Sequence, residues 1–271
     1  MSKRFAMSTY VDEYVPLEKE LRSKRDAGKK LLIPYLTAGY DQDWIVSVEA
    51  IANAGADAIE IGIPFSDPIM DGPTIQAASQ RALERGTTPI SIFSELAKLD
   101  VGVPLIAMTY CNLLFHAGFE RYLGWLKDGN IAGTIFPDLP LEEAGEWTEL
   151  ANRAGVANIF LVSPTTPTLR AAKLCSATTG FVYGIGLMGV TGVRETLSNS
   201  ASEIAKSIKA VTDQVVMVGI GISTPSQAKS VVRDADGVII GSALVKILLE
   251  GGGPAHAFEF VKSIRSAIDS L

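Results

Sequence analysis

Eight short apolar segments recur along this chain, and segments of helical character separate them. The eight segments span residues 31–39, 58–64, 104–110, 133–138, 158–164, 180–186, 215–221 and 237–243. Strands that alternate with helices pair in parallel, because each helix carries the chain back to the edge where the previous strand began. Eight such units close into a barrel, whereas an open doubly wound sheet more usually has about five or six strands. We therefore predict an α/β fold, a (β/α)₈ TIM barrel.

The length of the chain favours one large domain. Its 271 residues are 47% hydrophobic, and a domain of this size can bury about three quarters of its unfolded surface. Barrels of about 250 residues commonly form a single domain. We expect residues 1–16 to be a loose leader and residues 17–271 to form the barrel domain. This domain would begin with a charged amphipathic helix that runs from Leu17 to a stop signal at Gly28.

Charge and composition exclude several classes of protein. The formal net charge is −6, so we expect no nucleic acid partner. Cys111 and Cys175 lie far apart and in no metal-ligand spacing, which argues against a disulfide and a metal site. No apolar run approaches the 18 or so residues that span a bilayer, and the first residues lack the apolar centre of a signal peptide. We expect a cytoplasmic protein without membrane contact, although a cleaved transit peptide stays open.

Segment 58–64 places a carboxylate on a face that is buried in a barrel. Isoleucines occupy positions 59, 61 and 63, while Glu60 has the other parity, with a small residue on each side. If the isoleucines face the helices, Glu60 points into the barrel. A buried and unpaired carboxylate raises its pKa, which suits a general acid/base near neutral pH. The alternative, a structural Glu60 paired with a Lys or Arg, stays open.

The loop after this strand carries a second acidic candidate. Residues 64–76 contain three prolines, one glycine and two aspartates, a composition typical of a functional loop. Asp71 is the candidate, and a helix is expected to follow from Ile75 to Lys98. Asp71 or Thr74 would cap that helix in the structural alternative.

Further candidates follow other strands. In barrels of this kind, reactive groups gather at the carboxyl ends of the strands. Tyr110 follows the third predicted strand, Asp138 follows the fourth, and Tyr183 lies on the sixth. Each has a structural alternative, since the tyrosines could be core residues with satisfied hydroxyl groups and Asp138 a turn former.

Glycine-rich segments follow the last three predicted strands. They span residues 189–192, 219–223 and 241–246, and Ser242 adds a hydroxyl group to the third. Loops after strands seven and eight, with the start of a short helix, form the recurrent phosphate site of many barrels. We therefore predict a phosphate site here.

With these motifs assembled, the sequence resembles the tryptophan synthase alpha subunit family from about Leu17 onward. The segments that carry the resemblance are LIPYLTAG, GADAIEIGIPFSDPIMDGPTIQ, MTYCN, FPDLPLEE, MGVTG, VGIGIS and GSALVKI. The second is long and unusual in composition, so chance does not explain it.

The resemblance implies a retro-aldol cleavage of indole-3-glycerol phosphate to indole and glyceraldehyde 3-phosphate. Indole would pass to a beta subunit in an α₂β₂ tetramer. No cofactor is implied for this chain, and pyridoxal phosphate is expected only in the beta partner. By position in the shared motifs, Glu60 matches the catalytic glutamate, Asp71 the aspartate that holds the indole nitrogen, and Tyr183 a tyrosine of the site wall.

The same resemblance implies roles for the loops. The phosphate cradle matches four residues, namely Gly192, Gly221, Gly241 and Ser242. Tyr110 is expected among the substrate-binding residues, and Thr191 is interpreted as a lid residue. Asp67 matches a loop aspartate that meets the beta subunit, and Asp138 lies at the same mouth of the barrel.

One departure from the family pattern lies just before the segment GVTG. A serine, an arginine and a serine of one common form of the family are replaced here by Gly186, Leu187 and Met188. An apolar Leu187 cannot make the hydrogen bonds of an arginine. The details of loop closure and of signalling to the partner are therefore open.

Three other interpretations remain. A stand-alone indole-3-glycerol-phosphate lyase would share every catalytic residue and release free indole. Another phosphate-binding barrel of amino-acid biosynthesis, such as an isomerase, would leave the segment PFSDPIMDGPTIQ unexplained. A scaffolding subunit without activity is the third, and the intact Glu60 and Asp71 argue against it.

Overall fold

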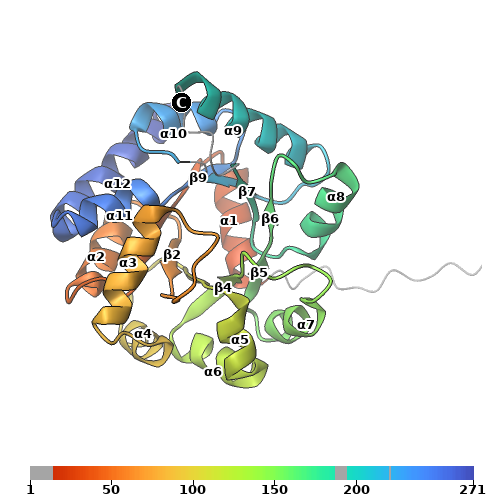
Figure 1. Ribbon diagram of the computed structural model, residues 1–271. Coiled ribbons are helices and arrows are strands. Elements are labelled where there is room, and N and C mark those ends of the chain that lie inside the picture. Colours follow the sequence, from red (N-terminus) through yellow and green to blue (C-terminus); the bar gives the residue numbers. More distant parts are fainter. Residues whose placement is uncertain (1–14, 187–193, 220) are drawn as a thin grey trace, which may run out of the picture.

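The computed structural model describes residues 15–186, 194–219 and 221–271, and it has a closed parallel sheet at its centre. Every strand pairing is parallel, and helices surround the strands (Figure 1). The strands are β1 (Leu31–Thr37), β2 (Ile59–Gly62), β3 (Leu105–Met108), β4 (Ile131–Ile135), β5 (Ala157–Ile159), β6 (Leu161–Val162), β7 (Val182–Ile185), β8 (Val216–Gly219) and β9 (Gly237–Ile240). The predicted TIM barrel is confirmed.

The fifth predicted strand is broken into two short strands. β5 pairs with β4 and β6 pairs with β7, while Phe160 lies between them. The Phe160 carbonyl accepts a hydrogen bond from the Tyr183 N–H at 3.1 Å, so pairing continues across the break. Because β5 and β6 follow one another directly, they join the two edges of the sheet. The nine strands therefore fill the eight positions of the barrel.

The described part of the chain contains helices before β1, between successive strands except β5 and β6, and after β9. They are α1 (Pro16–Asp26), α2 (Trp44–Asn53), α3 (Pro73–Glu84), α4 (Pro89–Leu96), α5 (Cys111–Ala117), α6 (Phe119–Asp128), α7 (Gly145–Arg153), α8 (Thr168–Ala177), α9 (Arg194–Lys209), α10 (Pro225–Val231), α11 (Ser242–Leu249) and α12 (Gly253–Asp269). None of the helices in the described ranges is long and apolar enough to cross a membrane.

The single helix predicted from Ile75 to Lys98 is wrong, because the structure breaks it into α3 and α4. Gly86 has a φ of +79° between them, a conformation that favours glycine and ends a helix. α4 then starts anew: the Thr88 side chain accepts a hydrogen bond from the Ser91 N–H, and Pro89 takes the first helical position. Gly86, Thr88 and Pro89 are thus the stop and start signals that separate the two helices.

Side chains alternate between two cores along the strands. The isoleucines at 59, 61 and 63 pack in the larger core, between the sheet and its helices. Ala58 packs in the smaller core together with inward residues of the other strands, such as Ile33 and Ile106. The predicted parity of β2 is confirmed, and it leaves Glu60 facing the barrel interior.

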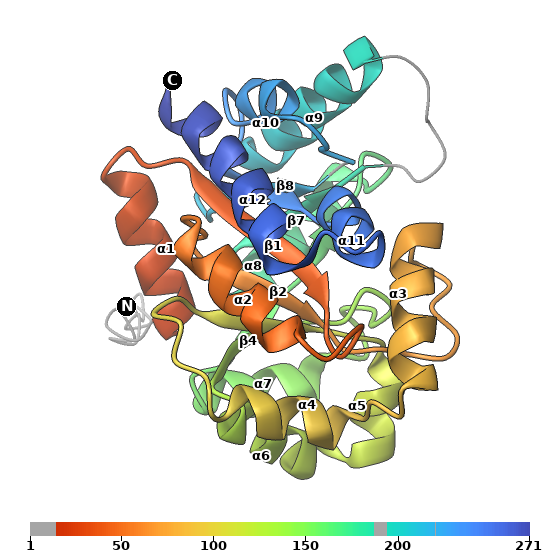
Figure 2. The ribbon, with the colours of Figure 1, turned by 90° about the vertical axis from the view of Figure 1, so that its left-hand side faces the viewer.

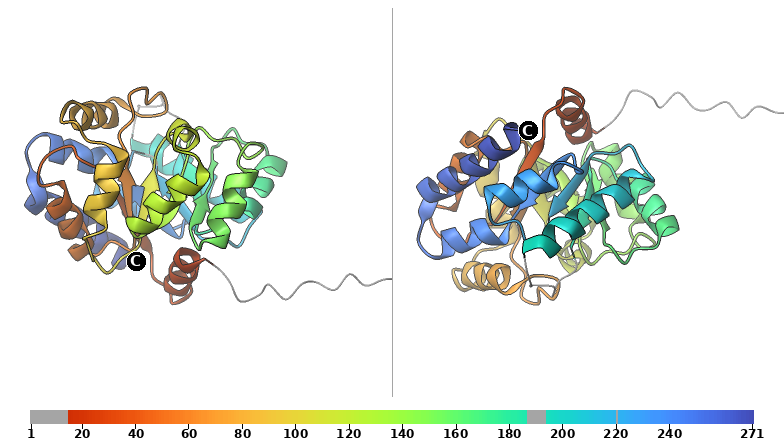
Figure 3. Two further views of the ribbon diagram at one scale, coloured as in Figure 1. Left: turned by 90° about the horizontal axis from the view of Figure 1, so that it is seen from below. Right: turned by 90° about the horizontal axis from the view of Figure 1, so that it is seen from above.

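α1 closes one end of the barrel. Figures 2 and 3 show α1 beyond the ends of the strands, on the side where the chain begins. Leu17 of α1 is 1% exposed and packs in the smaller core inside the barrel, the inner core. A Cβ atom at Gly133 or Gly180 would lie only 3.0 or 3.3 Å from the Leu17 side chain. These glycines therefore provide the space that Leu17 fills, and the open end of the barrel lies opposite α1.

Replacing Leu17 by alanine should lower the free energy of unfolding by about 2–5 kcal/mol, because it leaves a cavity in the inner core. Urea denaturation measures this loss. Leu169→Ala is the matched control: Leu169 is 83% exposed, so its loss should change the stability by about 0.5 kcal/mol or less. Equal, small effects of both changes would contradict the docking of α1.

Candidate active site

A cavity of about 180 Å³ opens at the carboxyl ends of the strands, at the end of the barrel opposite α1. It brings together residues from distant parts of the sequence. Its lining consists of Tyr35, Glu60, Asp71, Ile75, Met108, Tyr183, Gly219, Gly221, Ile222, Ile239, Gly241 and Ser242. Six of these were predicted as site residues. Glu60 and Asp71 come from β2 and the loop after it, whereas the other four come from β7 and from the segments that follow β8 and β9.

Glu60 lies at the floor of this cavity. Its side chain is 1% exposed, and neither carboxyl oxygen has a hydrogen-bond partner within the described residues. Burial, and after it the nearby Asp71, together raise the pKa of Glu60 to about 8. The structure thus gives no ion pair to Glu60 in the part of the chain that it describes, and the direction of its pKa agrees with the prediction for a buried, unpaired carboxylate.

Tyr35 on β1 lies beside Glu60, and the sequence reasoning missed it. The two residues are register partners in the pairing of β1 with β2. A Cβ atom at position 62 would lie 2.0 Å from the Tyr35 hydroxyl oxygen, so only glycine fits there. The signal was available: Tyr35 shares the parity of Leu31 and Ile33, which face the barrel interior.

Asp71 lies in the loop between β2 and α3 and reaches the same cavity. Burial raises its pKa to about 6, against the opposing effect of a hydrogen bond from the Tyr110 hydroxyl. The Tyr110 hydroxyl also accepts the Met70 N–H at 2.9 Å, so Tyr110 fixes the loop next to Asp71. Asp71 is more enclosed than the polar composition of its loop indicated, yet at pH 7 most of it remains ionised.

The structure argues against a capping role for the loop residues. The N-cap of α3 is Gly72, and no side chain caps it. Thr74 lies inside the helix, and the Gln76 side chain donates to the Asp71 carbonyl at 2.9 Å rather than to its carboxylate. The Asp71 carboxylate therefore stays available to the cavity.

The other side of the cavity is rich in backbone amides. Gly221 follows β8 with a φ of +58°, and Gly241 follows β9 directly before Ser242, the first residue of α11. Amides at a helix start, together with its dipole, attract anions. The predicted phosphate residues Gly221, Gly241 and Ser242 thus share one wall. Thr191 and Gly192, as well as Leu187 and Met188, lie outside the described residues.

Tyr183 forms part of the wall between these two sides. A Cβ atom at Gly219 of β8 would lie 2.7 Å from the Tyr183 hydroxyl oxygen. Its pKa is raised, first by burial and then by Glu60. Like Tyr35, Tyr183 thus lies over a glycine of the next strand in the sheet and faces the carboxylates.

Three predicted residues lie outside the cavity lining. Tyr110 acts through the loop as described, and Asp67 is exposed in that loop. Asp138 accepts hydrogen bonds from the Cys111 N–H at 2.8 Å and from its thiol at 3.2 Å. Asp138 thus lies in the turn after β4, as the structural alternative proposed, and its carboxylate also binds the first turn of α5.

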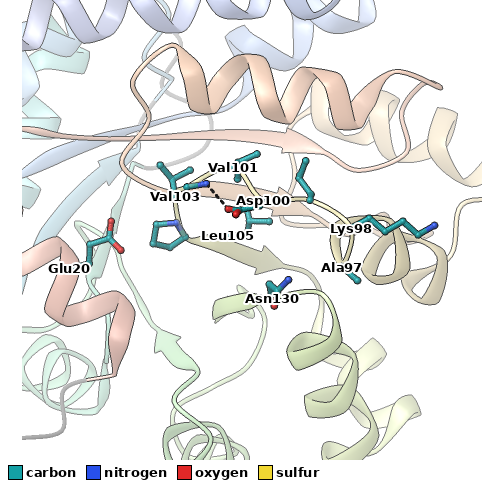
Figure 4. Close-up of a pocket in the computed structure, with 11 residues that line it drawn as sticks. Glu20, Ala97, Lys98, Asp100, Val101, Val103, Leu105 and Asn130 are labelled. Atoms are coloured by element: carbon teal, nitrogen blue, oxygen red, sulfur yellow. Dashed lines mark hydrogen bonds between the residues drawn. The ribbon is translucent and has the colours of Figure 1, made fainter.

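A larger hollow lies at the opposite end of the barrel, by the amino ends of β3 and β4 (Figure 4). Its lining comes from residues 97–105, Glu20 and Asn130, and the hydrogen bond drawn there joins the Gly102 N–H to Asp100. Glu20 already binds Lys24 at 2.7 Å. Active sites of such barrels lie at the carboxyl ends of the strands, so we assign the site to the smaller cavity.

Comparison with known proteins places this geometry in a family. The sequence pattern of the family described as "Tryptophan synthase alpha chain" matches residues 21–265. The chain belongs to the tryptophan synthase alpha chain family. The tryptophan synthase alpha chain of Methanosarcina barkeri is 42% identical over 254 residues, which cover 92% of this chain and 94% of the relative. That of Arabidopsis thaliana is 38% identical over 266 residues, or 94% and 96% of the two chains.

Solved structures of tryptophan synthase share the fold of this chain. A structure of Mycobacterium tuberculosis tryptophan synthase superposes with a TM-score of 0.87 at 35% identity, and the match covers 94% of this chain and 99% of the other. The resemblance derived from the sequence motifs is thus confirmed, and the family makes this chain a lyase of tryptophan biosynthesis. Among the described residues, no group of three His, Cys, Asp or Glu side chains could hold a metal ion.

Replacing Glu60 by glutamine should stabilise the protein more at high pH than at low pH. The folded pKa of about 8 lies above the ordinary value of 4.5, so the folded wild type binds more protons between these values and loses stability as the pH rises. Glutamine carries no charge at any pH. The difference in unfolding free energy between the variant and the wild type should be larger at pH 9 than at pH 5 by at least about 1 kcal/mol.

Urea denaturation at both pH values measures this difference, and pH 5 serves as the internal control. A difference that stays constant from pH 5 to pH 9 would contradict the buried, uncompensated state of Glu60.

Proposed function

We propose that Glu60 and Asp71 carry out the reaction of this family, the cleavage of indole-3-glycerol phosphate to indole and glyceraldehyde 3-phosphate. The observation that carries this proposal is the Glu60 carboxyl group, which is buried without a partner in the described ranges and has a pKa of about 8. A group with such a pKa can give and take a proton near neutral pH. The reaction requires both transfers.

In the proposed mechanism, Glu60 first donates its proton to C3 of the indole ring. The bond between C3 and C3′ then breaks, and its electron pair returns to the ring. The C3′ hydroxyl group loses its proton to the Glu60 carboxylate and becomes the aldehyde of the product. One carboxyl group thus serves both proton transfers, and it ends in its starting protonation state.

Asp71 would act by charge rather than by proton transfer. Protonation at C3 places positive charge on the ring nitrogen, and a carboxylate beside it stabilises that charge. The pKa of Asp71, at about 6, lies below that of Glu60. Two neighbouring carboxyl groups with separated pKa values can take different roles at one pH.

The amide-rich wall supports the binding of the phosphate group. Gly221, Gly241 and the start of α11 offer amide donors, and Ser242 offers a hydroxyl group. With the phosphate on this side, the indole ring would reach Glu60 among apolar residues such as Ile75 and Met108. The lid role of Thr191 and the contact of Gly192 with phosphate stay part of the proposal.

The rim of the cavity supports a protein partner, which we propose to be a tryptophan synthase beta subunit in an α₂β₂ tetramer. Ile69 is 81% exposed in the loop after β2, and Phe115 on α5 is 51% exposed. Asp67 lies in the same loop and would meet the partner, while Asp138 holds the start of α5. The chain itself would need no cofactor, pyridoxal phosphate would belong to the beta subunit, and the complex would work in the cytoplasm.

Glu60→Gln should lower the rate of indole release by about 100-fold or more, because glutamine cannot transfer the protons. Affinity for indole-3-glycerol phosphate, measured by calorimetry, should stay close to that of the wild type. Glu18→Gln is the matched control: Glu18 is equally buried but lies in α1 at the closed end, where it binds Arg22 and the Gly180 N–H. A Glu60→Gln variant with nearly the wild-type rate would refute the assignment.

The stand-alone lyase is the remaining alternative. Adding a tryptophan synthase beta subunit in excess should raise the rate of indole release strongly above that of the chain alone. Gel filtration of the mixture checks that a complex forms. Fast release that does not respond to the beta subunit would support the stand-alone lyase instead.

A further inference from the structure

Tyr35 has a place in the cavity that the proposed mechanism does not yet use. Its side chain runs along the wall from one side of the site to the other. A Cβ atom at Gly241 would lie 3.6 Å from the Tyr35 Cβ, whereas the Tyr35 hydroxyl oxygen lies next to Gly62 on the strand of Glu60. The ring thus starts at the proposed phosphate wall, and the hydroxyl group ends at the carboxylates. The glycerol chain of the substrate has to cover the same path.

The hydroxyl group of Tyr35 has a proton left to donate. Its hydrogen bond within the described residues joins it to the Thr37 hydroxyl at 3.3 Å, and both groups are buried. One bond between two hydroxyl groups uses one of their two protons. Thr37 is 1% exposed, while Tyr35 lines the cavity. If Thr37 donates to Tyr35, the remaining proton points to the cavity and its contents.

The electrostatic environment keeps this proton on the Tyr35 hydroxyl group. Burial raises the pKa of Tyr35, and Asp71 and Glu60 raise it further. Neither oxygen of Glu60 accepts a hydrogen bond from Tyr35 or any other described residue. The phenol is therefore a neutral donor rather than a base, and Glu60 does not already occupy it.

We infer that the Tyr35 hydroxyl, held by Thr37, donates a hydrogen bond to the C3′ oxygen of the substrate while Glu60 removes the proton from that oxygen. The inference rests on the proposed function. As the C3–C3′ bond breaks, the C3′ oxygen gives up its proton and gains negative charge before the aldehyde forms. A donor placed at this oxygen stabilises the transition state more than the bound substrate.

Tyr35→Phe tests this role, because it removes the hydroxyl oxygen and keeps the ring that fills the space over Gly62. We expect kcat for indole release to fall about 10- to 100-fold with a nearly unchanged KM, the pattern of an interaction made in the transition state. The pH profile should keep its midpoint, since burial and Asp71 set the pKa of Glu60.

Tyr40→Phe is the matched control. The Tyr40 hydroxyl also bonds a neighbouring hydroxyl group, that of Ser47 at 2.9 Å, and its side chain is equally buried, but it lies outside the cavity lining. Its loss should leave kcat and KM unchanged. Thr37→Val keeps the phenol and removes its anchor, so it should lower kcat in the same direction by a smaller factor. It also provides the test if Tyr35→Phe does not fold.

A ligand without the reacting oxygen separates this role from packing. An indole linked through a plain propyl chain to phosphate has no C3′ hydroxyl group, so Tyr35→Phe and the wild type should bind it with equal affinity. A wild-type kcat in Tyr35→Phe, a change in KM alone, a shifted pH midpoint, or weaker binding of this analogue would each overturn the inference. If the wild type releases no indole, the proposed function itself is refuted. This outcome is distinct from a failure of the Tyr35 inference, which is judged by comparing the variants with an active wild type.

Discussion

The burial of one carboxyl group that has no partner among the described residues is the constraint on which the site depends. Taking a charge out of water is unfavourable, so a buried group without an ion pair changes its pKa instead. Glu60 is in this position, with a pKa of about 8. A protein that needed only stability would place an apolar residue here. The unfavourable burial has a purpose if the group has to hold a proton at neutral pH and release it during a reaction.

Glycines in the barrel strands make room for the residues that surround this group. Gly62 accommodates the Tyr35 ring and Gly219 accommodates Tyr183, each on the strand next to the tyrosine. The same device works at the closed end, where Gly133 accommodates Leu17. The interior of an eight-stranded barrel is just wide enough for its side chains. A large residue therefore fits only where its neighbour is a glycine, which has no side chain. The tyrosines can thus enclose the carboxylates while a cavity remains.

The period of the strands made much of the site predictable. Alternation along β2 gave the inward direction of Glu60, and the order of the strands brought Gly221, Gly241 and Ser242 to one wall. The parity of its strand indicated that Tyr35 faces the barrel interior, but its closeness to Glu60 comes from the register of two strands, which the sequence alone does not give. The pKa of Asp71 was less predictable, because burial raises it while the Tyr110 hydroxyl, which follows the neighbouring strand β3, lowers it. The break between α3 and α4 was readable from Gly86 and Pro89.

The central claim is that Glu60 is protonated at neutral pH because no described residue compensates its charge. Carbon-13 NMR of the protein with labelled glutamate side chains follows its carboxyl carbon directly, and Glu60→Gln assigns the signal by its absence. The account predicts a titration midpoint near 8. A midpoint near the ordinary value of 4.5 would show that Glu60 is solvated or paired in solution, and it would contradict the account.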